Sequence, residues 1–122
     1  MIAVAAIDKA GNLAGFSNYG KGTVDLGAPG VEIWSTVADG DTSYAAYSGT
    51  SMATPHVTGA VALYAAVNPT ATGGQIRTAI LNAAKTRYTP SLDRKTVTNG
   101  RLDISCLKDL NATTLTTLGI CK

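Results

Sequence analysis

The chain has 122 residues, of which 45% are hydrophobic and 6% aromatic, and its formal net charge is +2. This length suits one domain that buries roughly two-thirds of its unfolded surface, and the composition differs from that of a charge-rich disordered segment. No basic cluster indicates nucleic-acid binding, and the longest apolar helical run, residues 59–67, is shorter than the ~20 residues that cross a bilayer. We therefore expect a globular domain without a nucleic-acid or membrane partner.

The chain opens on an apolar run, residues 2–7, that predicts a strand buried on both faces. Residues 8–12 follow as a turn, in which Asp8 is expected to be a solvated carboxylate. A single carboxylate is far below the six to eight oxygens that calcium takes, so we expect no metal and no cofactor. Met1 is not followed by the basic start of a secretory signal, and a chain that begins on a core strand is expected to be a fragment, a processed piece or an engineered piece.

Two further strands are predicted at residues 23–26 and 31–37, with a Gly-Ala-Pro-Gly turn at residues 27–30 between them. Residues 38–48 are expected to form a polar loop with a tight turn at Asp-Gly.

A helix is predicted over residues 51–68, and because it is apolar nearly all round we expect it to be central and buried. A second, amphipathic helix is expected at residues 72–85. Beyond it, residues 89–99 are predicted to be a loop and residues 101–104 a short strand. The tail, residues 105–122, is predicted to hold a weak helix at residues 107–118, because four threonines lower its helix propensity.

Ser51 begins the first of these helices, where unpaired N–H groups and the positive end of the helix dipole gather. Two interpretations are open. Serine is a preferred N-cap, and Pro55 in the first turn fits any helix start, so position alone favours a cap. A hydroxyl at that place can also attack a carbonyl while nearby amides stabilise the negative oxygen.

Residues 49–59 read Gly-Thr-Ser-Met-Ala-Thr-Pro-His-Val-Thr-Gly, and this ungapped stretch resembles the nucleophile segment of the subtilisin-like serine proteases. The resemblance continues in the segments around it: residues 2–8, 16–20, 24–31, 47–51, 75–81 and 100–103. It implies that residues 1–104 are the C-terminal part of a subtilisin-like peptidase domain, followed by an unmatched tail at residues 105–122. It also implies that Ser51 is the nucleophile and that its backbone N–H donates to the oxyanion hole.

The fold that the resemblance implies is α/β, a partial subtilisin-like three-layer fold with a mostly parallel sheet and a buried nucleophile helix. The implied activity is serine endopeptidase, with a peptide or protein substrate cleaved through an acyl-enzyme on Ser51. The family is mostly secreted, which implies an extracellular location. The tail contains Cys106 and Cys121. They form either a disulfide bridge or two free thiols, and a secreted context favours the disulfide.

No stretch of the chain resembles the family segments that carry the catalytic aspartate and histidine. His56 is the only histidine, and five residues of helix place its side chain roughly 140° from that of Ser51, so we expect it to be a packed or capping side chain. A lysine base is not indicated either, because Thr54 occupies the Ser-x-x-Lys position. The chain alone is therefore predicted to have little or no activity.

Two classes of function remain. In the first, the chain is part of a peptidase, and the missing N-terminal part of the domain supplies the base and the orienting aspartate. In the second, it is a non-catalytic remnant or a self-associating structural module of the same fold, whose free sheet edge favours a homo-oligomer. Asp25 and Asp103 are expected to be structural in either case.

Overall fold

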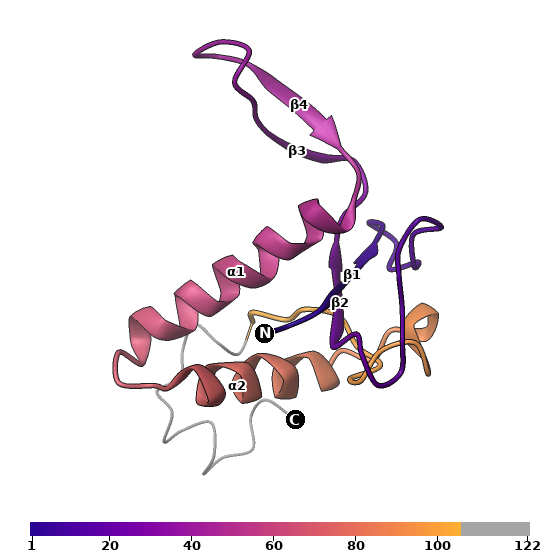
Figure 1. Cartoon of the computed structure of the whole chain (residues 1–122), viewed down its shortest axis with the longest axis vertical. Helices are drawn as coiled ribbons and strands as arrows, with labels where there is room; N and C mark the ends of the chain where they lie inside the picture. Colours follow the sequence, from indigo (N-terminus) through magenta and orange to yellow (C-terminus); the bar gives the residue numbers. More distant parts are fainter. Residues whose placement is uncertain (106–122) are drawn as a thin grey trace.

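The structure, a computed structural model, describes residues 1–105 (Figure 1). Two helices lie beside a small parallel sheet, and a β-hairpin projects away from them. The elements in chain order are β1 (Val4–Ile7), β2 (Leu26–Pro29), β3 (Ile33–Thr36), β4 (Tyr44–Tyr47), α1 (Thr50–Val67), α2 (Gly73–Lys85) and the short 3-10 helix η1 (Pro90–Leu92).

The central sheet consists of β1 and β2, which pair in parallel from Val4 opposite Leu26 to Ile7 opposite Pro29. Because side chains alternate along a strand, the two faces bury different partners. Ala6, together with Leu26 and Ala28 of β2, packs in the core that α1 and α2 cover. On the opposite face, Ala5 and Ile7 pack against Leu92 of η1. Helices, sheet and η1 segment thus form three layers, as expected of a partial α/β subtilisin-like fold.

Strand β2 lies three residues later than predicted, because residues 27–30 were interpreted as a turn. Gly27 belongs to the strand for a packing reason: a Cβ there would lie 2.6 Å from Leu92 Cδ1. Its N–H donates to Gly100 O at 3.0 Å, and its carbonyl accepts from Leu102 N at 2.7 Å. The strand predicted at residues 101–104 was also wrong, since only Arg101 forms a bridge, with Gly27.

The β3–β4 hairpin was predicted only in its first strand. Tyr44–Tyr47 forms β4, antiparallel to β3, where a loop was expected. The tip between the strands is closed by a hydrogen bond of 3.1 Å from Val37 N to Ser43 O. The hairpin therefore adds an antiparallel pair to the parallel pair of the core.

Helix α1 buries one face, at the helical spacing of Ala53, Val57, Ala60 and Tyr64. Other positions along it are exposed, among them Thr54, Thr58, Ala62 and Ala66. The expectation that the helix is buried all round was therefore wrong for this chain: α1 lies on the sheet by one face and leaves another uncovered.

Helix α2 was predicted almost to the residue. Thr72 is its N-cap: the hydroxyl accepts from Gln75 N at 3.2 Å, and the Gln75 side chain accepts from Thr72 N at 2.9 Å. This reciprocal pair is a capping box, and it fixes the start of the helix.

Several predictions fall on residues outside the described part of the chain: the helix at 107–118, the pairing of Cys106 with Cys121, and the tail at 105–122 apart from Ser105. Within residues 1–105, no helix combines the length and the apolar character that crossing a bilayer demands.

Candidate active site

Ser51 stands in the first turn of α1 and is exposed. The N-cap of the helix is Gly49, and no side chain makes a capping hydrogen bond there. The alternative in which Ser51 is a plain cap is therefore wrong. The hydroxyl is not committed to the backbone of its own helix.

The first backbone N–H groups of α1 differ in whether they have a hydrogen-bond acceptor. Met52 N donates to Gly49 O at 3.0 Å, and Ala53 N donates to the same carbonyl at 3.3 Å. Among residues 1–105, neither the N–H nor the hydroxyl of Ser51 makes a hydrogen bond. An unpaired donor at the positive end of a helix is suited to binding a negative oxygen.

The turn before Ser51 is held against the end of β2. Gly49 N donates to Gly30 O at 2.7 Å. This approach requires glycine at position 30, because a Cβ there would lie 2.7 Å from Ala6 Cβ and 2.8 Å from Gly49 O. One residue before the turn, the Ser48 hydroxyl accepts from Glu32 N at 2.9 Å. These two contacts tie the base of the hairpin to the start of α1.

A cavity of about 450 Å³ opens between the hairpin and the first turns of α1. The hairpin contributes Trp34 and Tyr47, and the helix contributes Ser51, Met52 and His56. Trp34 is 72% exposed and Tyr47 is 52% exposed. Ser51 thus faces a hollow large enough for part of a peptide, with aromatic side chains on one side.

His56 lines the same cavity, yet it is engaged elsewhere. Its Nδ1 lies 2.9 Å from Met52 O, one helical turn earlier. Because a carbonyl only accepts, Nδ1 carries the proton in this contact. The side chain is half-buried, and no hydrogen bond within residues 1–105 joins it to Ser51. These contacts agree with the interpretation of His56 as a packed side chain.

The lysines do not supply a base in the described part of the chain. Lys9, Lys21 and Lys85 are exposed, and Lys95 lies 5.5 Å from the centre of the Tyr19 ring. Lys108 lies outside the described residues.

The Asp8 carboxylate forms its hydrogen bonds within its own turn. Its carboxylate accepts from Ala10 N and Asn12 N, each at 2.9 Å, and from the Asn12 amide at 3.1 Å. These hydrogen bonds, those from Asn12 foremost, lower the pKa of the Asp8 carboxyl. No group of three or more metal-ligating side chains gathers within residues 1–105.

The other two carboxylates make structural contacts. Asp25 is buried. Its Oδ1 lies 2.7 Å from Nη2 of Arg77 in an ion pair, and its Oδ2 accepts a hydrogen bond from Ala3 N at 2.8 Å. Partial burial of Asp103 works to raise its pKa, but hydrogen bonds from Ser105 and the charge of Arg87 outweigh it, so the pKa of Asp103 is lowered.

Sequence reasoning located Ser51 but missed the hairpin wall of the cavity. The available signal was the pair of short runs Ile-Trp-Ser-Thr and Tyr-Ala-Ala-Tyr, rich in β-favouring residues and separated by a polar Asp-Gly turn.

Comparisons with known proteins show which family the chain belongs to. The family model described as the subtilase family matches residues 1–103. An extracellular protease of Xanthomonas campestris is 50% identical over 91 residues, which cover 70% of this chain and 16% of that protein. A subtilisin of Bacillus pumilus is 51% identical over 76 residues, covering 62% of this chain and 26% of that protein.

Among solved structures, a protease from Pseudoalteromonas arctica superposes with a TM-score of 0.75 at 29% identity. The match covers 88% of this chain and 35% of that one. The chain belongs to the subtilase family. It spans about a sixth to a quarter of the length of the two relatives named above.

Proposed function

We propose that this chain is the nucleophile-bearing part of a serine endopeptidase and that Ser51 is the nucleophile. The observation that carries the proposal is the state of Ser51: it is exposed, its N–H and hydroxyl are unpaired among the described residues, and it faces a cavity. The names of the relatives, an extracellular protease and a subtilisin, support the same activity. They also support a peptide or protein substrate and an extracellular location.

In the proposed reaction, the Ser51 oxygen attacks the carbonyl carbon of the scissile peptide bond while a general base takes its proton. The carbonyl oxygen becomes negative and is stabilised by the Ser51 N–H at the start of α1. The C–N bond breaks, the amine leaves with the proton, and an acyl ester remains on Ser51. Water then hydrolyses the ester and releases the acid.

The general base must come from polypeptide outside this chain. The sequence has one histidine, His56, and no hydrogen bond among residues 1–105 joins its ring to the Ser51 hydroxyl. A serine hydroxyl without a base is a weak nucleophile near neutral pH. The isolated chain is therefore expected to hydrolyse peptides slowly or not at all.

The isolated chain is tested with a fluorophosphonate probe and a fluorogenic peptide. Trace labelling and no measurable turnover are expected, because proton removal is missing. Stoichiometric labelling at Ser51 by the chain alone would show that it carries its own base, and the proposal that the base comes from elsewhere would fail.

The catalytic role itself is tested in a chimera, in which this chain replaces the region of the Bacillus pumilus subtilisin that it matches. The chimera is expected to cleave peptides, and Ser51→Ala should lower kcat by about 10⁴-fold or more. Thr54→Ala, one turn along α1, is the control and should retain activity. A folded chimera whose turnover survives Ser51→Ala would reject Ser51 as the nucleophile.

A further inference from the structure

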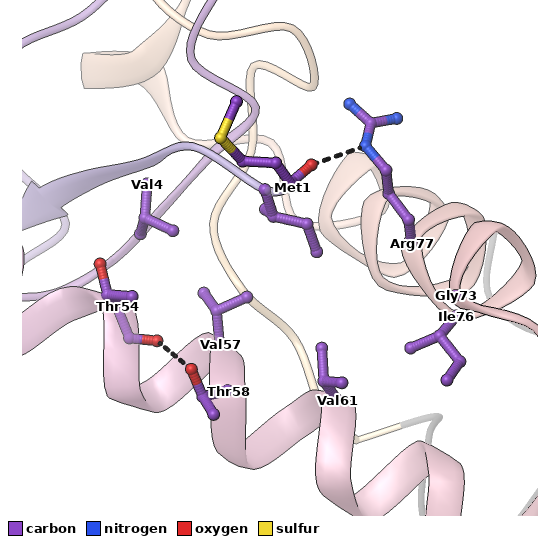
Figure 2. A pocket seen from close by; sticks show the side chains of 10 residues that line it. Met1, Val4, Thr54, Val57, Thr58, Val61, Gly73, Ile76 and Arg77 are labelled. Carbon is purple, nitrogen blue, oxygen red and sulfur yellow. Dashed lines mark hydrogen bonds between the residues drawn. The ribbon is translucent and has the colours of Figure 1, made fainter.

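Helix α2 is tied to distant parts of the chain near both of its ends. Toward its start, Arg77 donates through Nε to Met1 O at 3.0 Å, as Figure 2 shows. Beyond its end, Gly100 packs so closely on the chain that a Cβ there would collide with Ala84 O and lie 2.9 Å from Ala84 C. Position 100 therefore requires glycine, and the residue before it is Asn99.

Asn99 and Gly100 form an Asn-Gly pair, in which the backbone amide readily attacks the preceding side chain because glycine has no Cβ to hinder the approach. In this reaction Gly100 N bonds to Cγ of Asn99, the Cγ–Nδ2 bond breaks, and ammonia leaves with the amide proton. Water then opens the succinimide ring at either of its carbonyls. The product is aspartate or isoaspartate, and in isoaspartate the main chain runs through Cβ and Cγ.

The fold holds both reacting groups in other contacts. Asn99 Oδ1 accepts from Arg94 N at 2.9 Å, and Asn99 O accepts from Thr89 N at 3.0 Å. The amide of Gly100 is buried and donates to the Thr98 hydroxyl at 3.3 Å. Asn99 has a φ of +53°, in the left-handed region where asparagine is enriched. Ring closure requires the carboxamide to leave Arg94 and the amide to leave Thr98, so this segment must open first.

Opening the segment breaks further hydrogen bonds. The backbone N–H and the hydroxyl of Thr98 both donate to Asp25 O, at 3.1 Å and 2.8 Å. Val97 N donates to Val24 O at 2.8 Å. Residues 97–98 thus lie beside residues 24–25, which lead into β2. Because these bonds are lost together, the open form is a minor population of the folded chain.

Isoaspartate at position 99 does not fit this site. It adds an atom to the main chain immediately before Gly100, whose place is fixed from opposite sides. On one side, a Cβ at this glycine would lie 3.0 Å from Arg87 O. On the other side, Gly100 O accepts from Gly27 N of β2 at 3.0 Å. Aspartate leaves the main chain unchanged, and its carboxylate can accept from Arg94 N as the Asn99 side chain does.

We propose that Asn99 is a deamidation site controlled by the fold: it reacts when residues 94–100 open, and the isoaspartyl product prevents the segment from closing again. A reversible local opening is thereby made permanent by a covalent change. The proposal goes beyond peptide hydrolysis and does not depend on the role of Ser51.

The tip of the hairpin offers a matched comparison. Asp39 and Gly40 form an Asp-Gly pair, which closes the same ring with loss of water instead of ammonia. Asp39 is exposed, and its side chain makes no hydrogen bond within residues 1–105. Folding should therefore not slow the reaction at Asp39.

The rates are compared in the folded chain and in the chain unfolded by guanidinium chloride, at the same mildly alkaline pH. Trypsin releases residues 96–101 as one peptide, in which mass spectrometry measures deamidation. Asn99 should react at least about tenfold more slowly in the folded chain, because only the open fraction reacts. Isomerisation at Asp39, measured with an isoaspartyl methyltransferase, should be equally fast in both states.

The product is tested by refolding. After deamidation in guanidinium chloride, the denaturant is removed and folded chains are separated from unfolded ones by size-exclusion chromatography. Isoaspartate at position 99 should be enriched at least about tenfold in the unfolded fraction, because the longer main chain overpacks the site. The variant Asn99→Asp, which carries the other product, should refold with a urea midpoint close to that of the parent chain.

The proposal is overturned if Asn99 deamidates equally fast in both states, which includes a chain without a cooperative unfolding transition. It is also overturned if isoaspartyl chains refold as well as unmodified ones. Equal slowing of Asp39 and Asn99 on folding would reject the contacts of residues 94–100 as the cause. None of these measurements uses catalysis, so an inactive Ser51 would leave the proposal standing.

Discussion

The carbonyl of Gly30 accepts a hydrogen bond of 2.7 Å from the backbone N–H of Gly49, two residues before Ser51. This one contact joins the end of the central sheet to the start of α1. It is possible because Gly30 has no side chain, whose Cβ would lie 2.8 Å from Gly49 O. The exposed position of Ser51 follows from it.

Gly30→Ala should therefore disturb the turn. The added Cβ would meet Ala6 Cβ at 2.7 Å, Gly49 O at 2.8 Å and Ala53 Cβ at 3.1 Å. We expect a loss of about 1–3 kcal/mol in the free energy of unfolding, measured by urea denaturation. Gly59→Ala is the matched control: nothing lies within 4 Å of its added Cβ, and alanine is the better helix former, so a gain of about 0.5–1 kcal/mol is expected. Equal effects at the two glycines would contradict this account.

The partly buried ion pair between Asp25 and Arg77 should matter more for the free energy of unfolding than the exposed pair between Asp93 and Arg94. Asp25→Ala leaves Ala3 N without its acceptor and should cost about 1–3 kcal/mol. Asp93 and Arg94 lie 3.7 Å apart with side chains 42% and 83% exposed, so Asp93→Ala should cost less than about 0.5 kcal/mol. Urea denaturation of both variants measures the difference, and a larger loss from Asp93→Ala would count against the structure.

The capping box at the start of α2 should be measurable on its own. Thr72→Ala removes the acceptor for Gln75 N and should lower the free energy of unfolding by about 0.5–2 kcal/mol. Thr78→Ala, at an exposed position inside the same helix, should be neutral or slightly stabilising. Helical content by circular dichroism and urea midpoints report both, and loss of stability from Thr78→Ala alone would refute the assignment of the cap.

Stability should fall in acid, because the pKa values of Asp8 and Asp103 are lowered in the folded chain. Their contribution is complete above the pKa of the unfolded chain, about 4, and is lost as the pH falls through the lower folded values. The urea midpoint should be level between about pH 7 and pH 5 and decline below about pH 4.

The control for this pH dependence is a pair of variants. The decline of the urea midpoint below about pH 4 is called the acid limb here. Asp103→Asn should make this limb less steep, because it removes a carboxylate that Arg87 and Ser105 stabilise. Asp39→Asn, at the exposed hairpin tip, should leave the acid limb unchanged. An acid limb that is the same in all three proteins would assign the effect to other groups.

The sequence predicted best where local chemistry decides structure. The amphipathic pattern of residues 72–85 predicted α2, and the segment around Ser51 predicted α1 and the membership of the chain in the subtilase family. The predictions failed where contacts between residues far apart in the sequence determine the structure. Gly27 looked like a turn residue, yet it is a strand residue because Leu92 packs on it. The apolar positions around α1 predicted a helix enclosed on all sides, but residues 1–105 cover only one of its faces.

The candidate site likewise has a part that the sequence predicted and a part that it did not. Ser51 was named from sequence, and the structure added its unpaired N–H and the cavity beside it. The wall formed by Trp34 and Tyr47 depends on β4, and the two alanines of Tyr-Ala-Ala-Tyr make the local signal for its pairing with β3 a weak one. Long-range pairing of that kind is set by contacts between strands more than by the propensity of either one.

A hydrogen bond between Glu32 and Ser48 closes the base of the hairpin, and the bond between Gly30 and Gly49 joins this base to the end of β2 and the start of α1. Its far end, residues 37–43, has no such anchor, and Figure 1 shows it standing clear of both helices. Lengthening or shortening that end changes how far the hairpin, as a projecting arm, extends from the molecule, while its anchored base keeps α1 in place. Variation in loop length is therefore tolerated here, and the reach of the arm can diverge between relatives without moving Ser51.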